Sequence, residues 1–246
     1  MGSQTTNNLI TMQISYFKTT KETTPAGSMS IVDFVNHVRD GQWKDQIQRV
    51  RDEKDYEKRK ALKGTLPAVT TSGTFSKRND ASLLKYSGYM AIDLDGLNED
   101  LVEIKQTLLA DPYTFSVFIS AGGNGLCVIA QTTGEAVNHQ DHFRWAQSYY
   151  NRILKNAEVD TACRNISRLR YVSYDPDIMP ANPNSKTLGK KSETKPAKKT
   201  AKFPPTTDTQ IGRIVQEVVQ GGHNIAEEYP EYWGIACGFA IELGES

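Results

Sequence analysis

Residues 89–96 read YMAIDLDG, an apolar run that ends in two aspartates and a glycine. An extended backbone sends residues i and i+2 to the same face, so Asp93 and Asp95 are expected side by side at the end of a buried strand. Paired carboxylates in this arrangement are ligands for Mg²⁺ or Mn²⁺, whose other coordination positions are filled by phosphate oxygens and water. The alternative is that the aspartates and Gly96 only turn the chain after the strand.

The pattern downstream of this strand is regular and predicts an α+β fold. The expected elements are a strand at 87–95, a helix at 98–110, strands at 114–120 and 125–131, a helix at 137–156 and a last strand at 169–174. This β-α-β-β-α-β order is that of ferredoxin-like and RNA-recognition-type (RRM) domains, in which the first and third strands are central neighbours. Asp160, just before the last strand, is then expected to approach Asp93 and Asp95 from the side opposite the third strand. The sequence therefore predicts three carboxylates on one sheet face.

Shorter elements are expected upstream. A strand at 12–17 precedes an amphipathic helix capped by Ser30, and a highly charged helix at 44–62 is most simply a solvated face. A short strand within 66–75 then runs into a glycine-containing turn. The basic residues that follow this turn are expected near a loop tip.

Three regions are predicted along the chain. They are a globular domain at 1–185, a basic flexible linker at 186–206 and a partial helical domain at 207–246. The linker either steers DNA by attracting phosphate or serves as a solubilising tether. The helical region ends without a stop signal of its own, which indicates a truncated second domain.

The composition, 38% hydrophobic and 24% charged, is that of an ordinary globular protein. No apolar stretch reaches the roughly 20 residues of a membrane helix, and the first residues lack the layout of a signal peptide. A cytoplasmic protein without a membrane partner is therefore expected. The formal net charge is +0, so nucleic-acid binding has to rest on local basic segments. The three cysteines are widely spaced and are expected to be reduced thiols.

Small and basic residues are candidates for phosphate contacts. Ser120, Gly123 and Gly125 lie in a turn between two strands, where small residues let backbone N–H groups approach an anion; a simple glycine-rich hairpin is the alternative. Arg168 and Arg170 are expected on one face of the last strand, as charged forks for triphosphate or template, or else as surface ions. The remaining basic candidates, for which a solvated surface is the simpler interpretation, are Lys77, Arg78 and Arg164.

The combined pattern resembles the archaeo-eukaryotic primase or primase-polymerase superfamily. Residues 14–178 look most like the VirE N-terminal-like, primase-related domain of mobile elements, and this resemblance covers about two-thirds of the chain. The tail around Trp233 is similar to the small helical domain that often follows such cores. The motifs that carry the resemblance are LPAV at 66–69, SAGGNGLC at 120–127, SYDPD at 173–177, the acids Asp93, Asp95 and Asp160, and the arginines Arg164, Arg168 and Arg170.

The resemblance implies a two-metal nucleotidyl transfer on a single-stranded DNA template with nucleoside triphosphates, in replication of a plasmid, phage or integrated mobile element. Asp93 and Asp95 would hold the Mg²⁺ or Mn²⁺ ions, about 3.5–4 Å apart, and Asp160 would complete the site. The chain has no helicase motif of the form G-x-x-x-x-G-K-[ST], so unwinding would come from another chain or a missing portion. The residues implied to contact nucleotide are Ser120, Gly123, Gly125, Cys127 and Arg168, and those implied to contact nucleic acid are Lys77, Arg78, Arg164 and Arg170.

One position departs from the family pattern. The family has a histidine that contacts the incoming triphosphate after the Ser-Gly-x-Gly-Leu stretch, and this chain has Cys127 there. A thiol is a poorer donor to phosphate than imidazole. Either Cys127 is a small buried group and the triphosphate is held elsewhere, or polymerisation is weak or absent. The competing functions are a nucleic-acid or nucleotide binder that has lost catalysis and a metal-dependent nuclease that uses the same acids.

Overall fold

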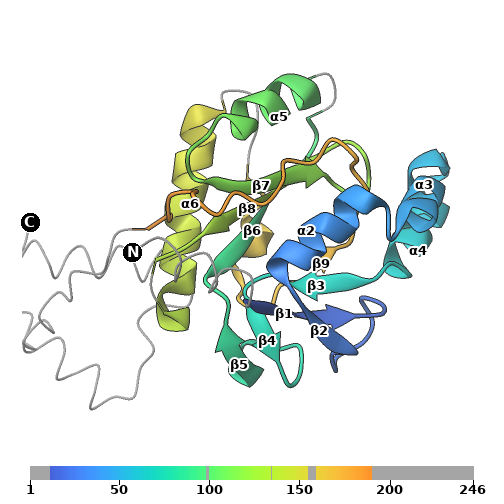
Figure 1. The fold of residues 1–246 in the computed structure, drawn as a ribbon. Helices are drawn as coiled ribbons and strands as arrows, with labels where there is room; N and C mark the ends of the chain where they lie inside the picture. The colour runs from blue at the N-terminus through green and yellow to red at the C-terminus, as the bar shows by residue number, and fades with distance from the viewer. Residues whose placement is uncertain (1–11, 98–99, 134, 155–158, 190–246) are drawn as a thin grey trace, which may run out of the picture. The chain divides into compact units, whose positions relative to one another are not determined.

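The structure, a computed structural model, describes residues 12–97, 100–133, 135–154 and 159–189 (Figure 1). These residues belong to one compact unit, Met1–Glu193. The predicted helical region at 207–246 and most of the predicted linker lie outside the described residues. The start of that linker lies against the domain, because Leu188 is buried and its N–H donates to Gln131 O at 2.7 Å. Within the described ranges, no helix is both long and apolar enough to cross a membrane.

The first sheet is antiparallel and joins strands that are far apart in the sequence. Its spatial order is β2 (Gly27–Ser30), β1 (Gln13–Phe17), β3 (Ala68–Thr70) and β9 (Arg170–Tyr171). β1 confirms the strand predicted near the start of the chain. α2 (Ile31–Asp40) follows β2 directly, and the Ser30 hydroxyl accepts a hydrogen bond from Asp33 N at 3.0 Å, which confirms the predicted helix cap.

The charged segment after α2 forms two helices instead of the single helix predicted at 44–62. They are α3 (Lys44–Asp52) and α4 (Tyr56–Gly64). Asp55 has an extended backbone and caps α4 with its side chain, and a residue in this conformation interrupts a continuous helical path. The prediction that this charged segment is exposed to solvent is also incomplete, because α3 buries Ile47 in the core.

A small antiparallel pair lies next to β1. It consists of β4 (Gly73–Phe75) and β5 (Leu83–Tyr86), with the 3-10 turn η1 (Asp80–Ser82) before β5. β3 and β4 together account for the strand and the glycine-containing turn that the sequence predicts within 66–75. Each of these two strands is three residues long, and a tight turn separates them.

The second sheet has the strand order β6-β8-β7 and is antiparallel. β6 (Tyr89–Leu94) is the predicted aspartate-bearing strand, and β7 (Thr114–Ile119) and β8 (Leu126–Gln131) form the predicted hairpin. α5 (Leu101–Leu109) and α6 (His139–Ile153) occur where helices are predicted. The first and third strands of the pattern are thus adjacent, as expected, and the described residues form a mixed, α+β fold.

The last strand of the pattern is not in this sheet, which corrects the predicted four-stranded β-α-β-β-α-β arrangement. β9 pairs with β3 of the first sheet, with Arg170 opposite Val69, and it has only two residues. Beside the end of β6, an isolated bridge joins Leu94 to Val159. The chain therefore touches β6 only briefly before it crosses to the first sheet, so the segment after α6 links the two sheets.

Two apolar clusters pack on opposite faces of the second sheet. Tyr89 and Ala91 join the cluster that contains residues of α2 and of the first sheet, whereas Met90 and Ile92 join the cluster with α5 and α6. Side chains alternate between the faces of a strand, so Asp93 shares the face of Tyr89 and Ala91. This alternation directs Asp93 toward the space between the two sheets.

Candidate functional site

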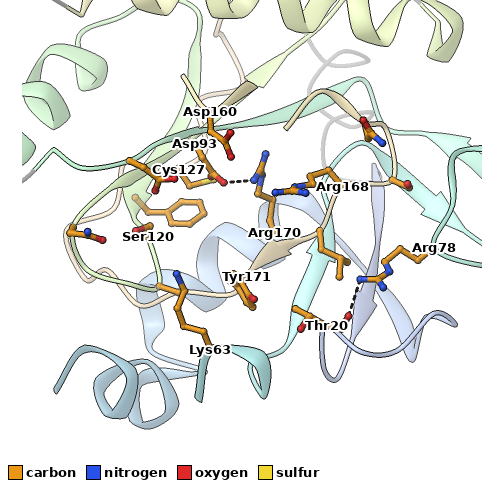
Figure 2. A pocket seen from close by; sticks show the side chains of 17 residues that line it. Thr20, Lys63, Arg78, Asp93, Ser120, Cys127, Asp160, Arg168, Arg170 and Tyr171 are labelled. Atoms are coloured by element: carbon orange, nitrogen blue, oxygen red, sulfur yellow. Dashed lines mark hydrogen bonds and ion pairs between the residues drawn. The ribbon is translucent and has the colours of Figure 1, made fainter. Parts of the chain in front are cut away.

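A cleft of about 650 Å³ opens where the end of β6 meets the β7–β8 turn and the segment from Asp160 to Tyr171 (Figure 2). Its charged lining has both signs and comprises the acids Asp93, Asp95 and Asp160 and the basic residues Lys63, Arg78, Arg168 and Arg170. The three acids singled out from the sequence therefore lie in one cavity. They come from two parts of the chain that are more than 60 residues apart.

Arg170 forms an ion pair with Asp93 in this cleft (Figure 2). Its Nη1 donates to Asp93 Oδ2, and its Nη2 donates to Ala91 O at 3.1 Å. Burial works against the charged form of Arg170, but the Asp93 carboxylate and the nearby thiols outweigh it and raise the pKa of the guanidinium. Arg170 is 5% exposed, so the structure places it as the buried partner of an acid.

The backbone brings Asp160 against the end of β6. Asp160 N donates to Asp93 O at 3.0 Å. The 3-10 turn η4 (Thr161–Arg164) follows and carries Cys163 to the same place, where its Sγ lies 3.3 Å from Asp160 Oδ2 and 3.6 Å from Asp93 Oδ2. One ligand atom from each of Asp93, Asp160 and Cys163 lies within 4.8 Å of the other two. Nothing in the neighbouring sequence indicates Cys163, because this contact depends on the path of the chain.

Asp95 lines the cleft but is exposed, and it stands outside the compact group just described. Partial burial, followed by the charges of Asp93 and Asp160, raises the pKa of Asp95, and Lys63 and Arg170 offset this in part. Asp93 and Asp160 therefore disfavour the charged form of Asp95. A cation bound among them would relieve this repulsion.

The turn between β7 and β8 forms the wall beside Asp95. A Cβ on Gly125 would lie 2.5 Å from Leu94 O and 3.1 Å from Asp95 Oδ1, so only glycine fits there. Gly123 has a φ of +84°, a conformation that favours glycine. Ser120 lines the cleft, and its N–H donates to Gly125 O at 2.8 Å. Packing and backbone geometry thus account for the two glycines, and Ser120 is the predicted phosphate contact in the cleft lining.

Cys127 lies opposite Asp93 in the β6–β8 ladder and is 4% exposed, although it borders the cleft. Burial, followed by the Asp93 carboxylate, raises the pKa of the Cys127 thiol well above its ordinary value. The thiol is therefore neutral at ordinary pH and acts as a small buried group.

The basic residues of the cleft come from separate parts of the chain. Arg168 is exposed, and Arg78 is held in place by a hydrogen bond from Nη1 to Thr20 O at 2.8 Å. Lys63 of α4, with its Nζ 5.6 Å from the centroid of the Tyr171 ring, lies one residue beyond the helix predicted at 44–62. The two remaining basic candidates are exposed and lie outside the described lining of the cleft: Lys77 and Arg164.

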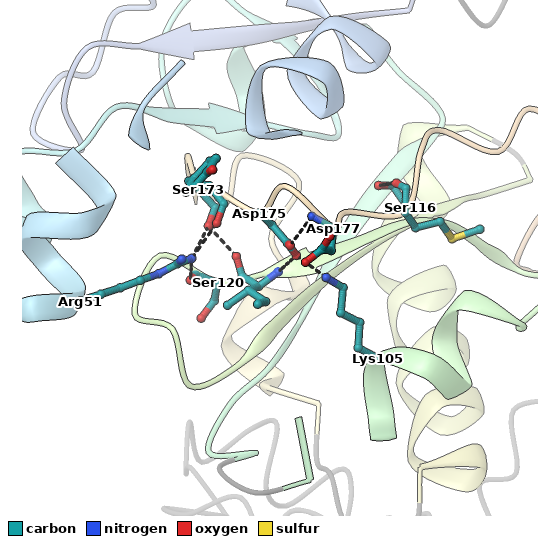
Figure 3. Close-up of polar contacts among 10 residues, drawn as sticks. Arg51, Lys105, Ser116, Ser120, Ser173, Asp175 and Asp177 are labelled. Atoms are coloured by element: carbon teal, nitrogen blue, oxygen red, sulfur yellow. Dashed lines mark hydrogen bonds and ion pairs between the residues drawn. The ribbon is translucent and has the colours of Figure 1, made fainter. Parts of the chain in front are cut away.

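A buried polar network holds the β7–β8 turn against the segment after β9 (Figure 3). Arg51 of α3 donates through Nη2 to Ser120 O at 2.9 Å, Tyr174 O at 3.0 Å and Ser173 Oγ at 3.3 Å. Burial lowers the pKa of Arg51, and Asp175 partly offsets this. The sequence indicated only a solvated, charged helix for Arg51. Its three acceptors are distant in the chain, so no local pattern could reveal these hydrogen bonds.

Asp175 continues this network (Figure 3). Its side chain is 1% exposed and accepts hydrogen bonds from Lys105 Nζ at 2.7 Å and from Ile119 N at 2.8 Å. Asp175 therefore joins α5 to the last residue of β7. Together with Arg51, it fixes the end of the hairpin from which Ser120 enters the cleft.

The fold and the cleft define a class of protein, an α+β domain whose two sheets border a cavity with acidic and basic side chains. Residues 61–179 match a family model described as "BT4734-like, N-terminal domain". The matched part includes every described residue of the cleft except Thr20. No curated protein and no protein of known structure matches the chain.

The compact group of Asp93, Asp160 and Cys163 fits a divalent metal ion by its chemistry. Carboxylate oxygens suit Mg²⁺ and Mn²⁺, and a thiolate suits softer ions. Arg170 contacts Asp93 Oδ2, the same oxygen that lies 3.6 Å from Cys163 Sγ, so an ion held by these three residues would share the Asp93 carboxylate with Arg170.

Proposed function

We propose that this domain is a metal-dependent nucleotidyltransferase of the primase-polymerase type, which acts on a single-stranded DNA template with nucleoside triphosphates. The observation that carries the proposal is the meeting of Asp93, Asp95 and Asp160 in one cleft together with basic side chains. The β6-β8-β7 order with two helices on one face supports a primase-polymerase fold. The setting is replication of a phage or mobile element, with a helicase supplied by another chain or domain.

Asp93 and Asp160 are the residues that would hold Mg²⁺ or Mn²⁺, with Asp95 completing the set from the exposed side. A bound ion supplies charge neutralisation at the reacting phosphate and activation of the attacking hydroxyl. Arg170 positions Asp93 through its ion pair and through its hydrogen bond to Ala91 O. The Arg51 network in turn positions Ser120 at the opposite wall.

The basic residues of the cleft bind the phosphates in this proposal. Lys63 and Arg168 are in the lining and place basic side chains in the same cleft as the acids. Because Cys127 is buried and neutral, it is a weak donor to phosphate, and we assign the triphosphate contact to Arg168 and Lys63 instead.

A primer-extension assay tests the proposal. The chain is incubated with a primed single-stranded template, Mn²⁺ or Mg²⁺, and deoxyribo- or ribonucleoside triphosphates. Asp160→Asn is the preferred variant, because Asp93→Ala would also leave the buried Arg170 without its partner. Asp141→Asn removes a carboxylate that is 73% exposed on α6 and is the matched control.

We expect extension by the parent and by Asp141→Asn, and a loss of at least about 10–100-fold in Asp160→Asn, since even outer-shell changes at metal sites cost this much. Absence of products with every metal and nucleotide would contradict the proposal.

The buried and neutral Cys127 favours a second candidate, a nucleic-acid or nucleotide-binding domain that has lost catalysis. Retention of DNA in a mobility-shift assay without extension would support this candidate. Release of short fragments without added nucleotide would instead identify a nuclease that uses the same acids.

A further inference from the structure

Cys163 has no part in the transfer reaction described above, although its thiol lies among the acids. The residue is 3% exposed, and η4 places its Sγ 3.3 Å from Asp160 Oδ2 and 3.6 Å from Asp93 Oδ2. All three side chains offer a ligand atom within 4.8 Å of the others. Of the described residues, it is these three that form a compact set of potential metal ligands, and Asp95 is not part of it.

The charges around this set suit a divalent cation. Arg170 offsets the charge of Asp93 through their ion pair. Asp160 and a deprotonated Cys163 would leave two further negative charges beside them, which a divalent ion neutralises. On binding, the thiol proton passes to solvent and no electron is transferred, because a metal ion binds the thiolate form of cysteine.

We propose that Cys163 is a metal ligand together with Asp93 and Asp160, and that its sulfur makes this site prefer thiophilic divalent ions such as Cd²⁺, Co²⁺ and Zn²⁺ over Mg²⁺. Oxygen-only sites suit Mg²⁺, whereas thiolate ligands select softer metals. The inference rests on the proposed function for the presence of a metal at these acids.

A spectroscopic titration tests the inference without any nucleotide or DNA. Cd²⁺ or Co²⁺ is added to the full chain, and the thiolate-to-metal charge-transfer absorption is recorded in the ultraviolet. All proteins carry Cys237→Ser, which removes the thiol that lies outside the described residues. The two compared variants are Cys163→Ser and Cys127→Ser.

Cys127 is the matched control because it is also a buried cysteine that borders the cleft, and it lies opposite Asp93 in the sheet. We expect the band in the Cys237→Ser parent and in Cys127→Ser, and its loss in Cys163→Ser. Cd²⁺ affinity should fall by at least about tenfold in Cys163→Ser, with little change for Mg²⁺.

Cys163→Asp provides a second, opposite change. Three carboxylates form a harder donor set, so the preference should shift toward Mg²⁺ by at least about tenfold relative to the parent. Circular dichroism and thermal unfolding establish that each variant is folded. If Cys163→Asp does not fold, the nearly isosteric Cys163→Ser still decides the result.

The inference is overturned if folded parent protein shows no thiolate band, or if the band is lost with Cys127 instead of Cys163. These results are separate from the test of the proposed function. Extension activity without a thiolate band would contradict the role of Cys163 as a ligand but support the proposed polymerase activity. A Cys163-dependent band without extension would support the metal site and contradict the polymerase activity.

Discussion

At the scale of single residues, the ion pair between Asp93 and Arg170 links stability to the site. Arg170 is 5% exposed, whereas the Asp93 side chain is 27% exposed. Removing Asp93 therefore leaves the positive charge of Arg170 with little access to water. Removing Arg170 leaves the negative charge of Asp93, which water still reaches. The two partners are not equivalent, and this asymmetry can be measured.

We predict that Asp93→Ala lowers the free energy of unfolding by about 3–5 kcal/mol, the usual cost of an uncompensated buried charge. Arg170→Met should cost less, and the double variant should recover a large part of the Asp93→Ala loss. Urea unfolding at neutral pH measures all three. Strictly additive effects would show that the two side chains do not act as a pair.

A second residue-scale prediction concerns pH. Burial, followed by His142, lowers the pKa of His139 from 6.5 to about 4, and its Nδ1 lies 3.0 Å from Tyr86 Oη. The unfolded chain therefore binds more protons than the folded chain between these values, so stability is lost as the pH falls from 6.5 toward 4. The loss amounts to about 3 kcal/mol for this group.

The measurement for His139 is the free energy of unfolding against pH for the parent and for His139→Gln. A glutamine can still bond to the Tyr86 hydroxyl but does not titrate, so the variant should lose less stability on acidification. Parallel curves for the two proteins would refute the assignment to His139.

At the scale of elements, the sequence predicted correctly those helices, strands and turns that depend on residues close together in the chain. The Ser30 cap, the apolar run of β6 and the glycine-rich turn after β7 all act within a few residues, and each occurs as expected. The strand predicted at 169–174 occurs as the two-residue β9 in the other sheet, and the helix predicted at 44–62 is interrupted. β9 is decided by pairing with β3, and the break before α4 by the conformation of Asp55.

The close packing of Gly125 against β6 gives a prediction at this scale. Gly125→Ala brings a Cβ to 2.5 Å from Leu94 O, a backbone atom that cannot move without shifting the end of β6. We expect a loss of about 1–3 kcal/mol, as for other overpacked sites, measured by thermal unfolding.

Gly122→Ala is the matched control from the same turn. Its Cβ would meet the Oδ1 of Asn124 at 3.0 Å, and that side chain can rotate away. The control should change stability much less than Gly125→Ala. Equal effects of the two substitutions would show that the turn, and not the contact with β6, limits the structure.

At the scale of the whole domain, the cleft exists because the segment after α6 crosses from the second sheet to the first. This crossing brings Asp160 and Cys163 to the end of β6 and places Arg170 beneath Asp93. Lys63 of α4 lines the same cleft as the acids. The cleft therefore combines acidic side chains with basic ones, and Arg170 is paired directly with Asp93.

We predict that Lys63→Ala and Arg168→Ala each weaken binding of a single-stranded oligonucleotide and reduce the slope of log affinity against log salt by about 0.7. Both side chains line the cleft, whereas Arg164 is exposed outside the described lining, so Arg164→Ala is the control. Fluorescence anisotropy at several salt concentrations measures the slopes. An equal effect of Arg164→Ala would mean that DNA binds the surface without using the cleft.

The sequence alone determined the features that depend on neighbouring residues: the strand that leads into Asp93 and Asp95, the hairpin beside it and the helices that precede and follow this hairpin in the chain. It also pointed to Asp160, because the last strand was expected next to β6. That strand pairs with β3 instead, and an isolated bridge between Leu94 and Val159 brings the chain to the end of β6. Only the tertiary structure assigned Arg170 to Asp93, Cys163 to the acids and Arg51 to the hairpin. Periodicity and capping act over a few residues. The contacts of Arg170 and Cys163 with Asp93, and of Arg51 with Ser120, join residues about 70 or more apart, and the path of the chain through space decides them.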